Sequence, residues 1–418
     1  MIVPSIDLAE GKVVQLVGGE DKALERDDAE ALARRFARYG EVNVIDLDAA
    51  RGRGDNTAML RSLLRLAPCN VGGGIRTPEQ AAGWIKAGAR RVILGSAAFG
   101  RDGVDLEFLE SLRRTIEPAR VVLAVDARSG KVTVSGWQEG TELGVLEAAR
   151  AVAPYCGALL YTCVEREGRL GGGDLETARA LREALPEHEL YVAGGLAEVD
   201  EIRALVELRA RPVLGMAIYT GKLQPEMLFA DLIDFEKGGG LVPTVVTDEQ
   251  GQVLSLVYSN RESLVQSLDT GRATYWSRSR QELWEKGLTS GNTQTLLDAA
   301  ADCDRDALVF RVRARGPACH LGSYSCFGPR RERPLRDLWT MARQRLQTPA
   351  DGLTDRLLAD SALLAGKIRE EADEVASADS RENLIWELAD LAYFCVVRAA
   401  GEGIEPEEVL DELKGRMR

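Results

Sequence analysis

An internal repeat constrains the fold of residues 1–235 more than any other feature of the sequence. Three pairs of segments align at offsets of 119, 121 and 120 residues, respectively: Ser5–Val14 (SIDLAEGKVV) with Ala124–Thr133 (AVDARSGKVT), Gly72–Gln80 (GGGIRTPEQ) with Ala193–Glu201 (AGGLAEVDE), and Leu94–Phe99 (LGSAAF) with Leu214–Tyr219 (LGMAIY). Because the offset is nearly constant, this part of the chain consists of two similar halves.

Short apolar runs alternate with amphipathic stretches throughout the repeated segment. The predicted strands are Ile2–Ile6, Val42–Asp46, Val92–Leu94, Val121–Val125, Ala158–Tyr161, Leu190–Val192 and Val213–Leu214. Runs such as Asp28–Tyr39 and Thr77–Ala87 lie between them and have the periodicity of helices. Repeated strand–helix units of this total length are typical of a closed parallel barrel, so we expect an α/β fold, a (β/α)8 TIM barrel over residues 1–236.

Two glycine- or charge-rich segments divide the rest of the chain. Phe235–Gly240 (FEKGGG) reads as a linker, because three glycines do not hold a helix. It is followed by strand-like runs at Leu241–Val246, Val253–Tyr258 and Ala307–Val312, which predict a small α+β domain over residues 240–328. A second linker, Gly328–Arg333, precedes an almost purely helical pattern over residues 334–418.

Composition limits the partners and the compartment. The net charge is -13, and no Lys/Arg-rich block builds a basic face, so nucleic acid is not expected as a partner. No apolar run reaches the roughly 20 residues that span a bilayer, and the N-terminal segment lacks the basic region of a signal peptide. The seven cysteines are an odd number, which favours a reducing cytoplasm over a disulfide framework.

Asp7 and Asp126 occupy equivalent positions in the repeat, each at the end of a predicted strand. Barrel enzymes keep their reactive groups at the carboxyl ends of the strands. Two carboxylates that face each other there suit general acid and general base catalysis. The alternative is that each aspartate caps the turn that follows it. We favour the shared site, because the repeat duplicates both positions.

Small residues recur in a two-fold pattern at the expected carboxyl ends of strands. Backbone N–H groups exposed at such turns bind phosphate, so a substrate with a phosphate at each end is expected. The candidate phosphate-binding residues are Gly73, Gly74, Gly95, Ser96, Gly194, Gly195 and Gly215.

The barrel segment resembles a histidine-biosynthesis isomerase family, phosphoribosylformimino-aminoimidazole-carboxamide ribotide isomerase. The resemblance is carried by VPSIDL, VGGGIR, LGSAAF, SGWQE and VAGG over about residues 1–230. It implies an Amadori rearrangement of a bis-phosphorylated aminoaldose to an aminoketose, with Asp7 as the base and Trp137 at the substrate. The segment that begins at Thr162 would supply the acid, which is Glu167 here.

The barrel departs from the family pattern at four positions. Glu167 replaces an aspartate and Arg169 a threonine, while Gln15 and Met216 stand where arginine is common. Glutamate has similar acidity but a longer arm, and a displacement of about 1 Å can cost about 100-fold in rate. We expect retained isomerisation. A shift to another phosphoribosyl isomerisation, such as that of phosphoribosylanthranilate, and a non-catalytic scaffold are the alternatives.

The segment 302–326 combines carboxylates and thiols in two patterns. In a strand, Asp302, Asp304 and Asp306 would share one face, where their hard oxygens suit magnesium. Cys303 would point to the opposite face and join Cys319 and Cys326 as zinc ligands, with the fourth position open for water. Zinc lowers the pKa of that water to about 7, and His320 could shuttle protons.

Three alternatives remain for these residues. The cysteines could be ordinary buried thiols, the aspartates could form an exposed acidic strand edge, and a zinc site could be completed across a subunit interface.

The same stretch resembles phosphoribosyl-AMP cyclohydrolase. GLVPTVVTD (240–248), SRSRQELWEKGLTSGNTQ (277–294) and DCDRD (302–306) carry the match over about residues 240–327. It implies hydrolytic opening of the adenine six-membered ring of phosphoribosyl-AMP by zinc-activated water. The residues that would then hold phosphate and ribose are Arg278, Arg280, Lys286, Thr289, Ser290 and Asn292. The alternative for that stretch is a solvated polar loop.

Two acidic helical segments lie in the C-terminal region. Glu371 and Glu374 form an i, i+3 pair, as do Glu387 and Asp390, so each pair shares a helix face. Two such helices facing each other would gather carboxylates around magnesium, with Glu370 beside them. The alternative is a solvated acidic face, but Asp390 lies in the apolar run LIWELADLAYF.

This pattern resembles phosphoribosyl-ATP pyrophosphohydrolase over about residues 334–418, together with Asp351–Leu358 (DGLTDRLL) and Lys367. The resemblance implies cleavage of phosphoribosyl-ATP to phosphoribosyl-AMP and pyrophosphate. The three resemblances name consecutive reactions, so we expect a trifunctional histidine-biosynthesis enzyme that uses Zn2+ and Mg2+. We expect it to be cytoplasmic, to act on small phosphoribosyl substrates without a membrane or nucleic acid, and to form a homodimer.

Overall fold

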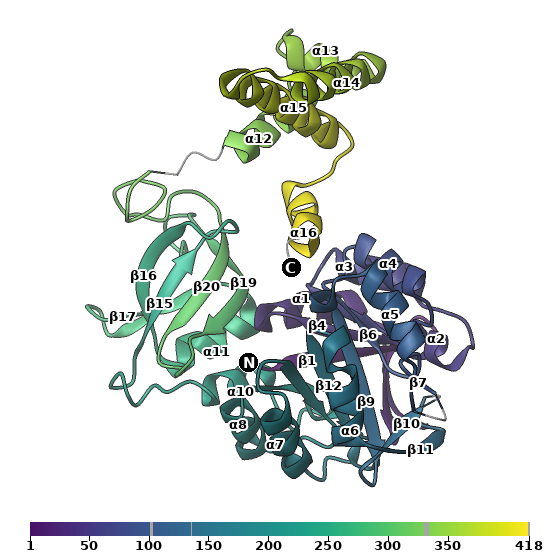
Figure 1. The fold of residues 1–418 in the computed structure, drawn as a ribbon. Helices are drawn as coiled ribbons and strands as arrows, with labels where there is room; N and C mark the ends of the chain where they lie inside the picture. Colours follow the sequence, from purple (N-terminus) through teal and green to yellow (C-terminus); the bar gives the residue numbers. More distant parts are fainter. Residues whose placement is uncertain (101–102, 135, 330–333, 417–418) are drawn as a thin grey trace. The chain divides into compact units, whose positions relative to one another are not determined.

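The computed structural model describes residues 1–100, 103–134, 136–329 and 334–416. The chain forms two compact units, which divide after Pro329 and are described separately. The first unit contains both the predicted barrel and the predicted α+β domain (Figure 1). The predicted second linker lies mostly outside the described residues.

Eight parallel strands close into a barrel, which confirms the predicted (β/α)8 fold. The strands are β1 (Val3–Ala9), β4 (Val42–Asp46), β5 (Cys69–Gly72), β6 (Arg91–Leu94), β9 (Val121–Arg128), β12 (Ala158–Cys163), β13 (Glu189–Ala193) and β14 (Ala210–Leu214). Two seams join the halves: β6 pairs with β9, and β14 pairs with β1.

Strand β5 is the one that the sequence pattern did not reveal. Its four residues, CNVG, are too few to show a periodicity, and Asn70 interrupts the apolar run. Asn70 is nevertheless fully buried, because its side-chain amide donates to Glu41 and Asn43, each at 3.0 Å. Tertiary hydrogen bonds thus permit a polar residue in a core strand.

Amphipathic helices cover the outside of the barrel in chain order. They are α1 (Ala29–Phe36), α3 (Thr57–Leu64), α4 (Pro78–Lys86), α5 (Leu106–Thr115), α6 (Val145–Val152), α7 (Leu175–Ala184), α8 (Val199–Glu207) and α10 (Pro225–Asp231), with short helices α2 (Leu47–Arg51) and α9 (Met216–Tyr219). Helix α4 begins as predicted at Thr77, whose hydroxyl accepts from the Gln80 N–H at 3.2 Å in a capping box.

A hairpin follows the first strand of each half. The hairpins are β2 (Lys12–Val17) with β3 (Asp21–Arg26), and β10 (Lys131–Val134) with β11 (Glu139–Gly144); a further pair of two-residue strands is β7 (Phe99–Gly100) with β8 (Gly103–Val104). Strand β2 pairs back on β1, with Val14 opposite Asp7. The hairpins therefore start at the carboxyl ends of the strands, where the site is expected.

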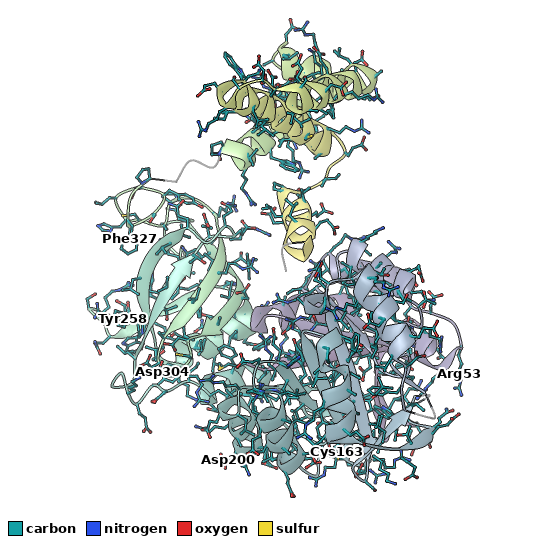
Figure 2. The ribbon with its side chains drawn as sticks, in the orientation of Figure 1. Arg53, Cys163, Asp200, Tyr258, Asp304 and Phe327 are labelled. Carbon is teal, nitrogen blue, oxygen red and sulfur yellow. The ribbon has the colours of Figure 1, made fainter. Side chains whose placement is uncertain are left out.

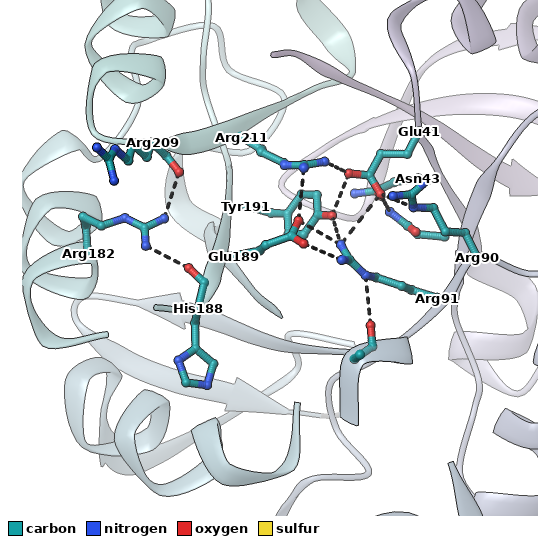
Figure 3. Close-up of polar contacts among 12 residues, drawn as sticks. Glu41, Asn43, Arg90, Arg91, Arg182, His188, Glu189, Tyr191, Arg209 and Arg211 are labelled. Atoms are coloured by element: carbon teal, nitrogen blue, oxygen red, sulfur yellow. Dashed lines mark hydrogen bonds and ion pairs between the residues drawn. The ribbon is translucent and has the colours of Figure 1, made fainter. Parts of the chain in front are cut away.

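The barrel interior has an apolar layer and a polar layer. Val3, Ile93, Val122 and Leu160 belong to the buried apolar cluster inside the barrel. At the amino ends of the strands, charged side chains replace the apolar ones and form a connected network (Figure 3).

Glu41, immediately before β4, lies at the centre of this network (Figure 3). Its carboxylate accepts from Tyr191 Oη at 2.8 Å and from the guanidinium of Arg211. Arg91 donates to Tyr191 Oη and, through both terminal nitrogens, to Glu189. Burial alone would raise the pKa of Glu41, but the charges of Arg211 and Arg90 hold it below its usual value. The network links strands from both halves.

The α+β part of the first unit is a four-stranded sheet with one helix. The sheet order is β16-β15-β20-β19. Its elements are β15 (Val242–Thr247), β16 (Val253–Ser259), α11 (Arg261–Thr270), β19 (Gln294–Ala301) and β20 (Leu308–Ala314), with the hairpin β17 (Thr274–Ser277) and β18 (Glu282–Glu285) beside it.

Polar contacts fasten the α+β part to the barrel. Arg38 Nη1 donates to the backbone oxygens of Leu268 and Asp269, at 2.7 and 2.6 Å, and so satisfies carbonyls at the end of α11. Arg261, the first residue of α11, forms an ion pair with Asp231 at 2.6 Å. Both ends of α11 are thereby tied to barrel residues, and the linker does not separate two independent bodies.

The second unit is all-helical, as predicted. Its helices are α12 (Pro334–Gln347), α13 (Leu353–Ala359), α14 (Ser361–Ser377), α15 (Arg381–Gly401) and α16 (Pro406–Arg416). A small core contains Trp339, Leu357, Leu364, Phe394 and Val397. Of the helices that the structure describes, none is long and apolar enough to cross a membrane.

We predict that Glu41→Ala lowers the free energy of unfolding by about 3 kcal/mol, because it removes the buried carboxylate to which Tyr191, Asn70 and Arg211 donate. Denaturant titration measures the change. Glu142→Ala is the control, because the Glu142 side chain is 93% exposed and pairs only with Lys131 at the surface. Equal effects of the two substitutions would contradict a stabilising role for the network.

Candidate active sites

Three carboxyl groups meet at the carboxyl end of the barrel. Asp7 lies near the end of β1, Asp126 lies near the end of β9, and Glu167 lies in the loop after β12. Burial raises the pKa of Glu167 to about 7, and the charges of Asp7 and Asp126 add to the shift. Burial likewise raises the pKa of Asp7 to about 6 and that of Asp126 above its usual value. The predicted carboxylates therefore form one coupled site.

Neutral donors hold two of these carboxyls. Ser5 Oγ donates to Asp7 at 3.1 Å, and Trp137 Nε1 donates to Asp126 at 2.9 Å. The hydroxyl of Thr162, on β12, also donates to Asp126. Ser5 was not among the candidate residues predicted from the sequence. It could have been found, because residues i and i+2 of a strand share a face.

The predicted glycines form two equivalent tight turns. Gly73 and Gly74 have φ of 97° and 69°, while Gly194 and Gly195 have φ of 100° and 78°. A Cβ on Gly73 would lie 2.1 Å from the Asp46 oxygen, and one on Gly194 2.5 Å from the Cys163 oxygen. Only glycine fits at these positions, because backbone of the neighbouring strand end lies where a Cβ would be.

The other predicted phosphate positions also follow strands. Gly95 and Ser96 come directly after β6, and Gly215 comes directly after β14 and caps α9. The repeat makes the two segments equivalent, which keeps the two-fold arrangement of candidate phosphate sites.

The loops around the carboxyls pack on one another. The Gly18 N–H donates to the backbone oxygen of Glu167 at 3.1 Å, so the β2–β3 turn contacts the loop that carries the Glu167 carboxyl. Trp137 adopts a left-handed φ of 70°, and a Cβ on Gly19 would lie 2.5 Å from its indole. A strained tryptophan held by a glycine turn is typical of a residue placed for a ligand.

Asp302, Asp304 and Asp306 lie close together, but the predicted strand is wrong. The residues occupy the turn between β19 and β20, where Arg305 has a φ of 64°. Asp302 Oδ1 accepts from the backbone N–H groups of Asp306 and Ala307 at 3.0 and 3.1 Å, which closes the turn. The three carboxylates still offer oxygens within 4.8 Å of one another, so convergence arises from the turn and not from strand alternation.

Lys237, in the first linker, contacts this aspartate cluster. Its ammonium lies 2.5 Å from Asp304 Oδ2 and also pairs with Asp306. These hydrogen bonds lower the pKa of Asp304. An internal cation thus offsets part of the repulsion among the three carboxylates.

The three candidate zinc thiols do not form one group in the described chain. Cys319 and Cys326 lie within reach of each other, and the Ser323 hydroxyl and the Leu321 N–H lower the pKa of Cys319. Cys303 is exposed in the aspartate turn. Figure 2 shows Asp304 and Phe327, the sequence neighbours of Cys303 and Cys326, at opposite ends of this sheet. Among the described residues, Cys303 therefore forms no candidate metal-binding group with Cys319 and Cys326 within one chain.

The other candidate residues of the α+β part surround the paired thiols or lie on exposed loops. Lys286 acts electrostatically on Cys319 and Cys326, and burial lowers its own pKa. The guanidinium of Arg278 stacks 3.7 Å above the ring of Tyr258, which orients it. Four further candidates are exposed, and Asn292 is half-buried. The exposed residues are His320, Arg280, Thr289 and Ser290.

In the second unit, α14 and α15 bring together Glu371, Glu374 and Glu387. Glu371 is 6% exposed, and its Oε2 has no hydrogen-bond partner. Burial raises the pKa of Glu371, and the charges of Glu374 and Asp390 raise it further. A buried, unpaired carboxylate oxygen beside two more acids fits a hard cation such as magnesium. Glu370 instead pairs with Lys367 at 2.8 Å.

Family comparisons agree with this division. A model described as histidine biosynthesis protein matches residues 1–224, which is more than half of the 418 residues. The chain belongs to that family. Models of phosphoribosyl-AMP cyclohydrolase and phosphoribosyl-ATP pyrophosphohydrolase match residues 255–328 and 335–417.

The match with this chain covers different shares of the curated relatives. A histidine biosynthesis trifunctional protein of Saccharomyces cerevisiae is 41% identical over 197 residues, which are 46% of this chain and 24% of that protein. A histidine biosynthesis bifunctional protein HisIE of Pyrococcus furiosus is 41% identical over 198 residues, 44% of this chain and 95% of that protein. The chain therefore spans about a quarter of the yeast relative and nearly all of the archaeal one.

We predict that Glu167→Gln stabilises the protein at pH 8 by about 1 kcal/mol but not at pH 4. The pKa of Glu167 is raised in the folded state, so the unfolded chain ionises first and the folded state loses stability as pH rises from 4.5 towards about 7. Unfolding titrations at both pH values measure the difference. Glu187→Gln, at an exposed position, is the control. A variant that destabilises at pH 8 would contradict the assigned desolvation.

Proposed function

We propose that this chain carries out three consecutive reactions of histidine biosynthesis. The supporting observation is that each of the three matched family segments contains its own cluster of ionisable side chains, at the barrel mouth, beside Cys319 and Cys326, and between α14 and α15. In the proposed order, phosphoribosyl-ATP is hydrolysed first, the adenine ring is opened second, and the aminoaldose is isomerised last.

The helical unit would hydrolyse phosphoribosyl-ATP to phosphoribosyl-AMP and pyrophosphate. Glu371, Glu374 and Glu387 would hold magnesium, with Asp390 beside them. Magnesium, when bound, neutralises the charge of the phosphates and of the developing pyrophosphate. The buried Glu371 oxygen without a partner supports this assignment. Asn383 Nδ2 donates to Glu387 at 2.6 Å and orients that carboxylate. Lys367, at 37% side-chain exposure, is placed to meet a phosphate.

The α+β part would open the adenine ring. Cys319 and Cys326 supply two thiol ligands whose chemistry fits zinc, and the lowered pKa of Cys319 favours the thiolate. Zinc, when bound, supplies Lewis acidity that activates water. We propose that Cys303 of a second copy completes the ligand set in a homodimer, because Cys303 is exposed and separate from the pair. Arg278 and Lys286 would hold the phosphoribosyl group, and His320 would move protons.

The barrel would isomerise the resulting bis-phosphorylated aminoaldose. Glu167, whose pKa is about 7, is about half protonated near neutrality, and its protonated form can donate to the ring oxygen as the C1–O bond breaks. Asp7, whose pKa is about 6, is then ionised and can remove the C2 proton of the imine. The proton count closes when the resulting enolamine gains a proton at C1 and loses the proton of its C2 hydroxyl, which gives the aminoketose. The glycine turns would hold the two phosphates.

The proposal extends to the cellular compartment and to a further metal site. We assign the protein to the cytoplasm, because all seven cysteines are free thiols in the structure. The aspartate cluster is a further magnesium candidate, since its three carboxylates converge. Lys237 would be displaced when the ion binds there.

We predict that Lys237→Ala tightens the binding of a divalent cation at the aspartate cluster, because the competing ammonium is removed. Electron paramagnetic resonance with Mn2+ measures affinity, and Asp304→Asn identifies the signal of this site. Lys222→Ala is the control, because Lys222 pairs with Glu198 elsewhere on the barrel. Unchanged Mn2+ affinity in Lys237→Ala would contradict the proposed competition.

We predict that wild-type protein, supplied with phosphoribosyl-ATP, Zn2+ and Mg2+, accumulates the aminoketose. The Asp7→Asn variant should stop at the aminoaldose, because the C2 proton stays in place, while both hydrolyses continue. Chromatography identifies the species that accumulates.

The same assay separates the alternatives. Accumulation of phosphoribosyl-AMP would contradict the ring-opening assignment. If the wild type stops at the aminoaldose but turns over phosphoribosylanthranilate, the barrel has the second proposed isomerase activity. Turnover of neither aminoaldose would make the barrel a scaffold for the two hydrolases.

A further inference from the structure

A buried glutamine lies between Asp7 and the loop after β14. Gln15, on β2, is 2% exposed. Its Nε2 donates to Asp7 Oδ2 at 3.5 Å and to the Val14 oxygen at 3.0 Å. Its Oε1 lies so close to Gly215 that a Cβ there would be 2.7 Å away. One amide therefore touches both the carboxyl at the end of β1 and a candidate phosphate loop.

The internal repeat shows that this arrangement is specific to one half of the barrel. At the offset of 119 residues, Gln15 is equivalent to Val134, and Ser5 is equivalent to Ala124. Neither Val134 nor Ala124 has a side-chain donor. Asp126 instead accepts from Trp137, whose equivalent in the first half is Gly18. The two aspartates occupy equivalent backbone positions but have different hydrogen-bond partners.

This difference matters for acid–base chemistry. A donor that bonds a carboxylate favours its ionised form, while a nearby cation would do so more strongly and weaken the group as a base. Among the described residues, the side chains that donate to Asp7 are the neutral Ser5 and Gln15. Burial raises the pKa of Asp7 to about 6, and the hydrogen bond from Ser5 offsets only part of that shift, which leaves a carboxylate that is basic yet ionised near neutrality.

We propose that Gln15 is a positioning residue that fixes the orientation of the Asp7 carboxylate and couples it to the Gly215 loop. The proposal rests on the isomerase function proposed for the barrel. Since Gln15 Oε1 packs against Gly215, a shift of that loop on phosphate binding is transmitted through one rigid amide to Asp7. The neutral amide orients the base without an ion pair.

The test compares charge variants at position 15. Gln15→Val, which copies the equivalent Val134, is expected to lower kcat about 10-fold, the loss typical for a hydrogen bond to a charged group. Gln15→Glu adds a negative charge beside Asp7 and should move the acidic limb of the kcat/KM profile to higher pH. Gln15→Arg should move that limb to lower pH. Opposite shifts would show that position 15 lies beside Asp7, and the loss of kcat in Gln15→Val tests the positioning role.

Two controls keep the outcome clear. Gln224→Val makes the same substitution at an exposed glutamine before α10 and should leave the profile unchanged. The titration of the Asp7 carboxyl carbon by NMR, assigned with Asp7→Asn, measures the same opposite shifts without substrate. Identical Asp7 titrations in Gln15→Glu and Gln15→Arg would overturn the proposal.

Failure of the isomerase function gives a different result. A wild type that does not turn over the aminoaldose, with Asp7 titrations that still shift in opposite directions, would refute the barrel reaction and retain the placement of Gln15. Active wild type with unshifted titrations would refute only the role of Gln15.

Discussion

Closure of the barrel at two seams is the constraint on which the first unit depends. Val3 pairs with Val213, and Val92 pairs with Val121, so the halves of the repeat complete one cylinder. Neither half has a closed set of strand hydrogen bonds by itself, and each would expose an apolar edge. Closure also places the carboxyl ends of all eight parallel strands at the same end of the barrel. Asp7 and Asp126, separated by 119 residues, thereby become parts of one site.

The carboxylates at the two ends of the barrel have different partners and opposite pKa shifts. At the amino end, Glu41 and Glu189 have arginine partners, and their pKa values lie below the usual range. At the carboxyl end, Asp7, Asp126 and Glu167 have neutral donors or none, and their pKa values are raised. Paired charges stabilise the fold, whereas unpaired ones cost stability and provide reactive protons. The apolar layer between them keeps the two sets apart.

The acidic clusters outside the barrel also differ in whether an internal cation pairs with their carboxylates. Lys237 already neutralises part of the Asp302–Asp306 turn, while Glu371 retains a buried oxygen without a partner. The spacing of the acidic residues in the sequence predicted both clusters as cation sites. The structure distinguishes them by what each carboxylate touches, because an internal ammonium and a metal ion satisfy the same electrostatic demand.

The sequence by itself determined the barrel, the α+β and helical segments, and most of the candidate residues, because repeats, periodicity and short motifs are local properties. The duplicated Asp7 and Asp126, the glycine turns and the acidic helices could all be predicted in this way. Strand β5, the aspartate turn, the separation of Cys303 from Cys319 and Cys326, and the contacts of Lys237, Arg38 and Gln15 were decided only by the tertiary structure. Each of these depends on which distant groups satisfy a buried or charged atom, and that pairing is created by the folded chain.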